Sequence, residues 1–147
     1  MTLRSPLGPS ILQWWSAQVD VNRMVILIAE DHEDVRLALS NLLKAGGFTV
    51  LAVGDGVAAL EASRNYPGTI DLLLSDMDMP GMSGLELCQT IAPERPGIKV
   101  LIMSGGLQEL EQVYMKGRPF LQKPFTGTAL RQSIKVLLGS NPPLRTP

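Results

Sequence analysis

Residues 25–31 read Val-Ile-Leu-Ile-Ala-Glu-Asp, an apolar run that ends in two acids. A short apolar run followed by charged residues is typical of a strand that is buried on both faces of a sheet. The next segment repeats apolar residues at helical spacing from Val35 to Leu43, and Gly46-Gly47 then stops the helix, as a glycine at C′ does. A buried strand followed at once by an amphipathic helix predicts one unit of a parallel α/β sheet.

The same alternation continues along the chain. Apolar runs that predict strands lie at 48–53, 70–75, 98–103 and 119–122, and segments that predict helices lie at 57–65, 85–91, 107–115 and 126–138. Five short strands that alternate with five helices require right-handed crossovers and a parallel sheet. The sequence therefore predicts a doubly wound α/β fold, a flavodoxin-like (βα)5 sandwich whose five strands lie in the order 2-1-3-4-5.

The two ends of the chain lack this alternation. Residues 1–23 begin with turn-forming residues and then carry apolar residues at helical spacing over 10–19, while residues 140–147 are rich in proline. We therefore expect an N-terminal extension over 1–23, flexible or forming a short helix, one domain over 24–139, and a C-terminal tail over 140–147. The alternatives for the extension are a partner-binding helix and a start codon misplaced upstream of Met24.

The composition excludes several classes of protein. The chain has 147 residues, enough for one domain, and its 13 basic and 14 acidic residues give a net charge of −1, which argues against a nucleic-acid partner. A single cysteine, Cys88, excludes an internal disulfide and a cysteine-based zinc site. The sequence has no apolar run of the roughly 18 residues that a membrane span needs, and its start is a poor signal peptide. We therefore expect a cytoplasmic protein with no membrane partner.

Polar residues stand at the ends of four of the predicted strands, namely Glu30-Asp31, Asp76 with Asp78, Ser104, and Lys123-Pro124. The carboxyl ends of parallel strands meet at one edge of the sheet, where such folds bind their ligands. Crowded carboxylates repel one another unless a cation joins them, and an open set of oxygen ligands suits Mg²⁺. Asp31, Asp76 and Glu30 supply three negative charges, which Mg²⁺ and Lys123 would balance. The neutralised cluster could then accept a phosphoryl group.

These strand ends, together with the loop at 79–84, resemble the receiver domain of two-component response regulators over about residues 24–139. The segment Phe-Leu-Gln-Lys-Pro-Phe at 120–125 and the short stretch after Gly105-Gly106 are similar to receivers attached to hybrid sensor kinases. The resemblance implies a signalling domain that is phosphorylated on itself, rather than an enzyme with a separate substrate. Its phosphodonor would be a sensor histidine kinase or a histidine phosphotransfer protein. Because only nine residues follow Leu138, we expect a stand-alone switch, shuttle or phosphate sink, with a downstream target protein as a possible partner.

The resemblance also implies a role for each acid. Asp76 would accept the phosphoryl group from phosphohistidine. Asp31 and Asp76 would bind Mg²⁺, or alternatively Mn²⁺, through their side chains, and Asp78 would bind it through its backbone carbonyl. Glu30 would act mainly through a metal-bound water.

The remaining residues would stabilise and report the phosphorylated state. Lys123 would neutralise charge on the transferring oxygens, and Ser104 would donate a hydrogen bond to one of them. Phe120 would be the switch aromatic, and the Lys123–Pro124 peptide bond would be cis. Ser104 stands where many members have threonine, and Phe120 replaces the commoner tyrosine, which removes a hydroxyl from the switch.

Three other functions compete with this interpretation. Asp76-Met-Asp78 also resembles the nucleophile loop of haloacid-dehalogenase-type phosphatases, but that loop follows the first strand of a larger chain. A flavodoxin-like electron carrier would need a phosphate-cradling loop where the acids of 30–34 stand. The third alternative is a receiver-like protein-interaction module that is not phosphorylated. Of the remaining polar residues, we expect His32 in an exposed loop and Cys88 in or beside the core.

Overall fold

The structure is a computed structural model that describes residues 2–3, 5–6, 23–106 and 117–139. Near the N-terminus, β1 (Thr2–Leu3) and β2 (Ser5–Pro6) form a pair of two-residue strands. The domain that follows is built from β3 (Val25–Ala29), α2 (Glu33–Ala45), β4 (Thr49–Val53), α3 (Gly56–Asn65), β5 (Leu72–Asp76), α4 (Gly84–Glu94), β6 (Lys99–Ser104), β7 (Phe120–Gln122) and α6 (Gly127–Gly139).

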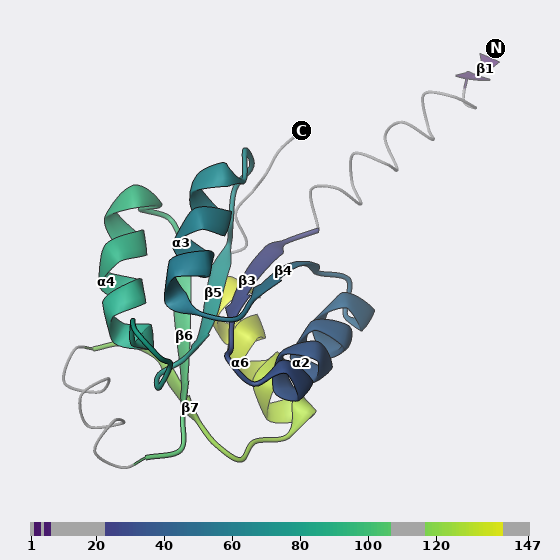
Figure 1. Cartoon of the computed structure of the whole chain (residues 1–147). Helices are drawn as coiled ribbons and strands as arrows, with labels where there is room; N and C mark the ends of the chain where they lie inside the picture. Colours follow the sequence, from purple (N-terminus) through teal and green to yellow (C-terminus); the bar gives the residue numbers. More distant parts are fainter. Residues whose placement is uncertain (1, 4, 7–22, 107–116, 140–147) are drawn as a thin grey trace.

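The five strands of this domain form one parallel sheet in the order β4-β3-β5-β6-β7. When β3 to β7 are numbered 1 to 5 along the chain, this is the predicted order 2-1-3-4-5. The predicted fold is therefore confirmed. Helices α3 and α4 cover one face of the sheet, and α2 and α6 cover the other (Figure 1). The helices expected over 10–19 and 107–115 lie outside the described residues.

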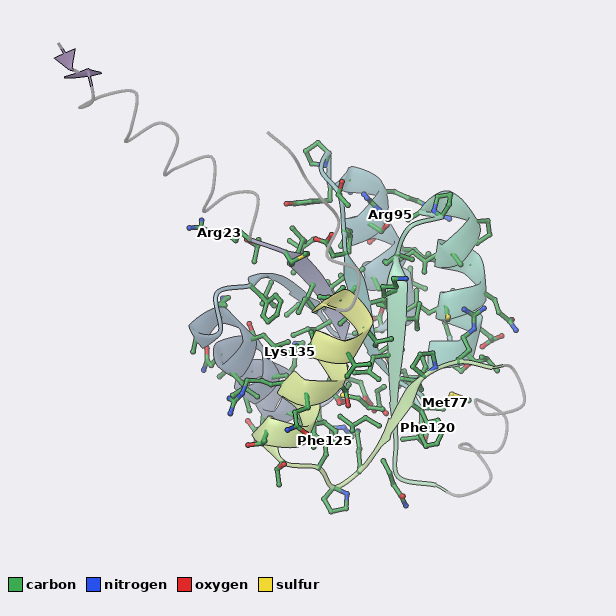
Figure 2. The ribbon with its side chains drawn as sticks, turned by 180° about the vertical axis from the view of Figure 1, so that it is seen from behind. Arg23, Met77, Arg95, Phe120, Phe125 and Lys135 are labelled. Carbon is green, nitrogen blue, oxygen red and sulfur yellow. The ribbon has the colours of Figure 1, made fainter. Side chains whose placement is uncertain are left out.

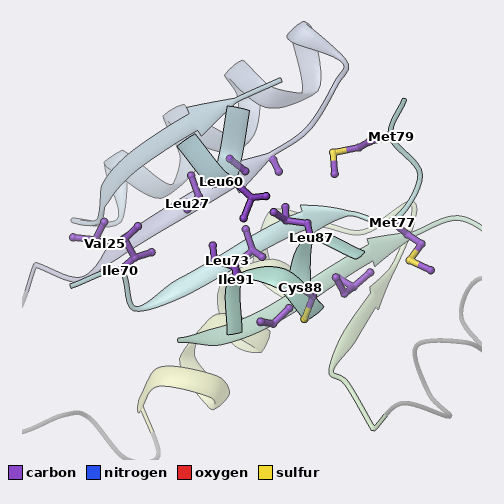
Figure 3. Packing of buried hydrophobic residues seen from close by; sticks show 14 residues of the cluster. Val25, Leu27, Leu60, Ile70, Leu73, Met77, Met79, Leu87, Cys88 and Ile91 are labelled. Atoms are coloured by element: carbon purple, nitrogen blue, oxygen red, sulfur yellow. The ribbon is translucent and has the colours of Figure 1, made fainter. Parts of the chain in front are cut away.

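Side chains alternate along the central strands between two buried clusters. On the face that α3 and α4 cover, Leu27 of β3 and Leu73 of β5 belong to one buried cluster (Figure 3). The helices contribute Leu60, Leu87, Cys88 and Ile91 to it. Because both faces of these strands are covered, every residue of β3 and β5 is buried. This burial explains the continuous apolar runs in the sequence.

The second cluster uses the alternate residues of the same strands. Ile28 of β3 and Leu74 of β5 pack with Leu43 of α2 and with Leu130 and Ile134 of α6. The two clusters together sandwich the sheet and hold its strand ends in fixed positions relative to one another.

The observed bounds differ from the predicted ones most at two elements. Helix α4 extends to Glu94 instead of residue 91, and β5 begins at Leu72 instead of residue 70. The reason for the later start of β5 is Asp71, whose buried carboxylate accepts a hydrogen bond from the backbone N–H of Val25 at 2.7 Å. The backbone N–H of Asp71 donates in turn to the carbonyl of Val25 at 2.9 Å. This exchange aligns the starts of β3 and β5 at the edge of the sheet opposite the acids. Within the described residues, no helix is long and apolar enough to cross a membrane.

Candidate functional site

Hydrogen bonds just past the strand ends fix the positions of the polar residues. The backbone N–H of Glu30 donates to Val53 at 3.1 Å, and that of Met77 donates to Met103 at 2.8 Å. The backbone N–H of Lys123 donates to the carbonyl of Ser104 at 2.8 Å. The parallel ladder therefore brings the acids, the hydroxyl and the ammonium to one edge of the sheet. Phe120 and Phe125 lie toward this end of the molecule and Arg95 lies toward the other (Figure 2).

Four potential ligand residues converge at this edge, namely Glu30, Asp31, His32 and Asp76. One ligand atom from each lies within 4.8 Å of the other three. The side chain of Glu30 is fully buried and that of Asp76 is 7% exposed, whereas Asp31 is 26% exposed. The cluster is therefore a buried carboxylate pair with a third carboxylate at its mouth.

Lys123 supplies the cation that the described part of the chain places among these acids. Its ammonium lies 3.3 Å from Oδ1 of Asp76 and 3.4 Å from Oε1 of Glu30. Partial burial lowers the pKa of Lys123, but the attraction of Asp76 and Glu30 outweighs this effect and raises the pKa above its ordinary value. Lys123 is thus held in its charged form beside both buried carboxylates.

Asp76 is the acid whose environment most disfavours its charge. Burial raises its pKa from the ordinary 3.8 to about 6, and repulsion from Glu30 adds to the rise. Lys123 and the backbone N–H of Asp78 lower the pKa but do not cancel the increase. The site therefore lacks positive charge, and an added cation would lower the cost of ionising Asp76.

The site residues also fit a divalent metal ion. Oδ1 of Asp31 is buried yet accepts no hydrogen bond from the described residues, and its nearest charged neighbour is Nδ1 of His32 at 3.4 Å. Carboxylate oxygens with open positions around them are the donor set that Mg²⁺ prefers. Asp31, Asp76 and Glu30 can therefore hold such an ion at this edge of the sheet.

The other residues singled out in the sequence border this cluster. Asp78 has an exposed side chain outside the ligand group, and its backbone N–H lies 3.5 Å from Oδ1 of Asp76. Ser104 is buried at the end of β6, where its Oγ accepts a hydrogen bond from the N–H of Gly106 at 3.2 Å. Phe120 is 37% exposed at the start of β7. The Lys123–Pro124 peptide bond is cis.

Two residues at the site were not predicted from the sequence. His32 is exposed, as expected, but its Nδ1 also lies 3.3 Å from Oε2 of Glu30 and 3.4 Å from Oδ1 of Asp31. Arg36 donates from Nη1 to the backbone carbonyl of Glu30 at 2.8 Å and so fixes the turn that carries the acids. Position 36 is one helical turn after position 32, and this spacing is the only sequence signal that places both residues beside Glu30.

Comparisons with known proteins agree with this geometry. The family model for the response regulator receiver domain matches residues 26–135. The chain is 34% identical over 118 residues to the chemotaxis protein CheY of Pseudomonas aeruginosa, an alignment that covers 76% of this chain and 94% of CheY. It is 32% identical over 119 residues to the sensor kinase CckA of Brucella abortus, covering 77% of this chain but only 12% of CckA.

Solved structures of receiver proteins superpose on this chain. A response regulator receiver protein from Pseudomonas putida superposes with a TM-score of 0.69 at 28% identity, covering 78% of this chain and 97% of that chain. The response regulator TrrA of Thermotoga maritima, crystallised in complex with Mg²⁺ and BeF, superposes with a TM-score of 0.70 at 25% identity, covering 78% of this chain and 99% of that chain.

Many relatives are longer proteins, and the chain spans 12% of CckA and 47% of the regulatory protein YrkP of Bacillus subtilis. The residues matched by the family model, 26–135, hold nearly all of the sheet and its acidic edge. Receiver domains of this kind bind Mg²⁺ and interact with histidine kinases or phosphotransfer proteins. The chain belongs to the response regulator receiver domain family of two-component signalling.

Proposed function

We propose that this receiver takes up a phosphoryl group on Asp76 from the phosphohistidine of a sensor kinase or a histidine phosphotransfer protein. The observation that carries the proposal is the position of Asp76. Its carboxylate is buried at the end of the central strand β5, next to an ammonium and next to carboxylates suited to a metal ion. A nucleophile, a cation and a metal-binding group are thus combined at one point.

The chemistry follows from these positions. A carboxylate oxygen of Asp76 forms the new bond to phosphorus, while the bond from phosphorus to the donor histidine nitrogen breaks and its electron pair returns to the imidazole. Lys123 lies within 3.3 Å of Asp76 and would stabilise negative charge on the transferring oxygens. The hydroxyl of Ser104 would donate a hydrogen bond to the phosphoryl group once it is attached.

A divalent ion completes the charge balance of this step. Asp31 and Asp76 would hold Mg²⁺, or Mn²⁺, through their side chains, with the backbone carbonyl of Asp78 and a water held by Glu30 as further ligands. When bound, the ion supplies positive charge that offsets the carboxylates and the incoming phosphoryl group. The buried oxygen of Asp31, which accepts no hydrogen bond from the described residues, supports this assignment.

The phosphorylated state would be read through Ser104 and Phe120. Ser104 pairs with Gln122 at the end of β7, and Phe120 begins the same strand opposite Ile102. A shift of the hydroxyl toward a phosphoryl group would therefore reach Phe120 along the paired strands. Phe120 is partly exposed and has no hydroxyl, so its signal would be a change in ring position alone. A downstream target protein would bind differently to the two ring positions if the protein acts as a switch. A shuttle or a phosphate sink would need no such target.

Phosphorylation with acetyl phosphate tests the proposal. Intact-mass spectrometry of the wild-type protein with acetyl phosphate and Mg²⁺ should show the addition of one phosphoryl group. Asp76→Asn should abolish this addition, and so should a chelator. Asp34→Asn, an exposed acid in the first turn of α2, is the matched control and should be labelled like the wild type. Full labelling of Asp76→Asn would show that the site assignment is wrong.

We also propose that the folding unit is residues 24–139, which encloses the region matched by the family model. A chain that starts at Met24 should then melt close to the temperature of the full chain and be labelled equally. A loss of several degrees, equivalent to roughly 1 kcal/mol for a domain of this size, would show that residues 1–23 pack on the domain.

A further inference from the structure

The turn between β3 and α2 carries Glu30 and Asp31, and one residue of α2 holds this turn on both sides of Asp31. Arg36 donates from Nη1 to the backbone carbonyl of Glu30 at 2.8 Å. The backbone N–H of Arg36 donates to the carbonyl of His32 at 2.9 Å. The residues before and after Asp31 are therefore both bonded to Arg36.

The Asp31 carboxylate depends on this backbone for its direction. No described residue donates a hydrogen bond to its buried Oδ1. Nδ1 of His32 lies 3.4 Å from that atom, but the imidazole side chain is 72% exposed, and exposed ion pairs hold their partners weakly. The position of Oδ1 is therefore set by the turn that Arg36 holds.

Arg36 acts on the backbone of the site and not on its charge. In the described structure, both buried carboxylates, Glu30 and Asp76, form an ion pair with Lys123, and Glu30 also contacts His32. The guanidinium of Arg36 bonds instead to an uncharged carbonyl. Arg36 is thus placed to orient the turn, whereas Lys123 offsets the negative charge.

Gly54, the residue after β4, leaves the space that this guanidinium needs. A Cβ atom at position 54 would lie 3.2 Å from Nη1 of Arg36, and among the described residues it would meet only that guanidinium within 4 Å. The φ angle of Gly54 is not positive, so its backbone can accept alanine. Gly54→Ala therefore shifts the Arg36 guanidinium and disturbs no other described group.

We propose that Arg36 is a positioning residue of the metal site, which orients Asp31 through the turn and so sets the affinity for Mg²⁺, and that Gly54 leaves its guanidinium in place. This role rests on the proposed function, which takes Asp31 as a metal ligand. Removal of a group that orients a metal ligand typically lowers metal affinity about 10- to 100-fold. Because Asp76 and Lys123 are not displaced, labelling with acetyl phosphate should fall at limiting Mg²⁺ and recover at saturating Mg²⁺.

Calorimetric titration of the full chain with Mg²⁺ tests this role. Arg36→Met keeps the apolar part of the side chain but removes its donors, and it should raise the Kd for Mg²⁺ about tenfold or more. Arg36→Lys restores one donor and should recover most of the affinity. Arg64→Met removes an exposed guanidinium from the last turn of α3 and is the matched control, so it should bind Mg²⁺ like the wild type.

Gly54→Ala tests the same contact from the other side, and it remains informative if Arg36→Met does not fold. It should raise the Kd for Mg²⁺ by about two- to fivefold in the wild type. In the Arg36→Met background it should have no further effect, because the guanidinium that the new methyl group meets is gone. Gly97→Ala, where a Cβ atom meets no described atom within 4 Å, is the control.

A second measurement needs no metal. The backbone N–H of His32 donates to Oε2 of Glu30 at 3.1 Å, so its hydrogen exchange reports the order of the turn. In metal-free protein, Arg36→Met should speed this exchange, and Arg64→Met should not. An Mg²⁺ affinity that is unchanged in both Arg36→Met and Gly54→Ala, or that is equally low in Arg36→Met and Arg36→Lys, would overturn the positioning role alone. A wild type that binds no Mg²⁺ would contradict the proposed function and this role with it.

Discussion

Nζ of Lys123 lies 3.3 Å from Oδ1 of Asp76, although the two residues end strands β7 and β5, which are separated in the sheet by β6. The long aliphatic part of the lysine side chain spans the end of the intervening strand. The ion pair therefore depends on the register of three strands and not on local sequence. Despite this contact, the pKa of Asp76 is raised to about 6, mainly because the carboxylate is buried.

The first prediction follows from that raised pKa. At pH values below 3.8, Asp76 is neutral in both the folded and the unfolded chain, so its ionisation does not change the free energy of unfolding. As the pH rises from 3.8 to about 6, the unfolded chain ionises first and the folded state loses relative stability. The full loss corresponds to roughly 3 kcal/mol and is present above pH 6. Asp76→Asn should therefore gain stability over the wild type between pH 4 and pH 7 when a chelator removes metal ions.

Urea unfolding at the two pH values measures this difference. Asp34→Asn controls for the loss of one exposed carboxylate. A stability difference between Asp76→Asn and the wild type that is the same at pH 4 and pH 7 would contradict the raised pKa. Saturating Mg²⁺ should stabilise the wild type more than the variant, because the ion binds the folded acids.

The parallel sheet could be predicted because its strands are short apolar runs separated by helices of clear periodicity. Burial on both faces explains both the runs of β3 and β5 and their position in the centre of the sheet. The start of β5 was misplaced by two residues, because the contact of Asp71 with Val25 joins positions 46 residues apart. Long-range contacts of this kind leave no periodic signal in a single sequence.

The second prediction concerns the loop that carries Asp76. Gly84 begins α4, and a Cβ atom at this position would overlap the backbone carbonyl oxygen of Asp76. Since backbone atoms cannot move aside as a flexible side chain can, Gly84→Ala should lower the free energy of unfolding by about 1–3 kcal/mol and reduce phosphorylation. Gly97→Ala is the matched control, because a Cβ atom there meets no atom of the described structure within 4 Å. Equal unfolding curves for the two variants would contradict the close approach.

The third prediction concerns the edge of the sheet opposite the acids. Arg95 follows α4 and donates four hydrogen bonds to the end of α3 and the loop after it, at Ser63 Oγ and to the carbonyl oxygens of Ser63, Tyr66 and Gly68. Arg95→Ala removes all four hydrogen bonds, although the carbonyl of Ser63 still accepts from the backbone N–H of Tyr66 at 3.4 Å. The substitution should cost about 2–3 kcal/mol in urea unfolding. Phosphorylation of the folded variant should be unchanged, because Arg95 lies toward the other end of the molecule from Met77, which follows Asp76 in the chain (Figure 2).

Arg64 provides the comparison for Arg95. It forms a bidentate ion pair with Glu94 on the surface, at 2.7 and 3.0 Å, and solvent screens this pair. Arg64→Ala should therefore change stability much less than Arg95→Ala. If the two arginine variants are equally stable, the hydrogen bonds of Arg95 contribute no more than an exposed ion pair.

The candidate site was predictable as far as the strand ends determine it. Asp76, Ser104 and Lys123 each follow an apolar run, and a parallel sheet brings such positions together. The contacts of His32 with Glu30 and Asp31 could not be predicted, because they depend on the direction of a side chain at the start of a helix. The same holds for Arg36, whose contact with the Glu30 carbonyl depends on the turn between β3 and α2. The four-residue spacing of positions 32 and 36 places both residues on one side of the helix start, but it does not show that this side contacts Glu30.

The last prediction concerns the lifetime of the phosphorylated state. The backbone N–H of Gly106 lies 3.2 Å from the Oγ of Ser104, so residue 106 borders the hydroxyl that would hold the phosphoryl group. Gly106 has no side chain to shield the phosphoryl group from water, whereas Asp78 presents an exposed carboxylate near the same site. That carboxylate could orient an attacking water or repel it as negative charge develops, but either effect requires that water first reach phosphorus. We therefore expect the open position at 106 to dominate and the phosphorylated state to be short-lived, as suits a shuttle or a sink.

Gly106→Arg and Gly106→Tyr should slow dephosphorylation by about three- to tenfold, a barrier increase of roughly 1 kcal/mol. The decay can be followed by intact-mass spectrometry after acetyl phosphate is removed. Gly106→Ala, which adds a single methyl group, should lie between the wild type and the bulky variants, and unchanged or faster decay in both bulky variants would contradict the shielding argument.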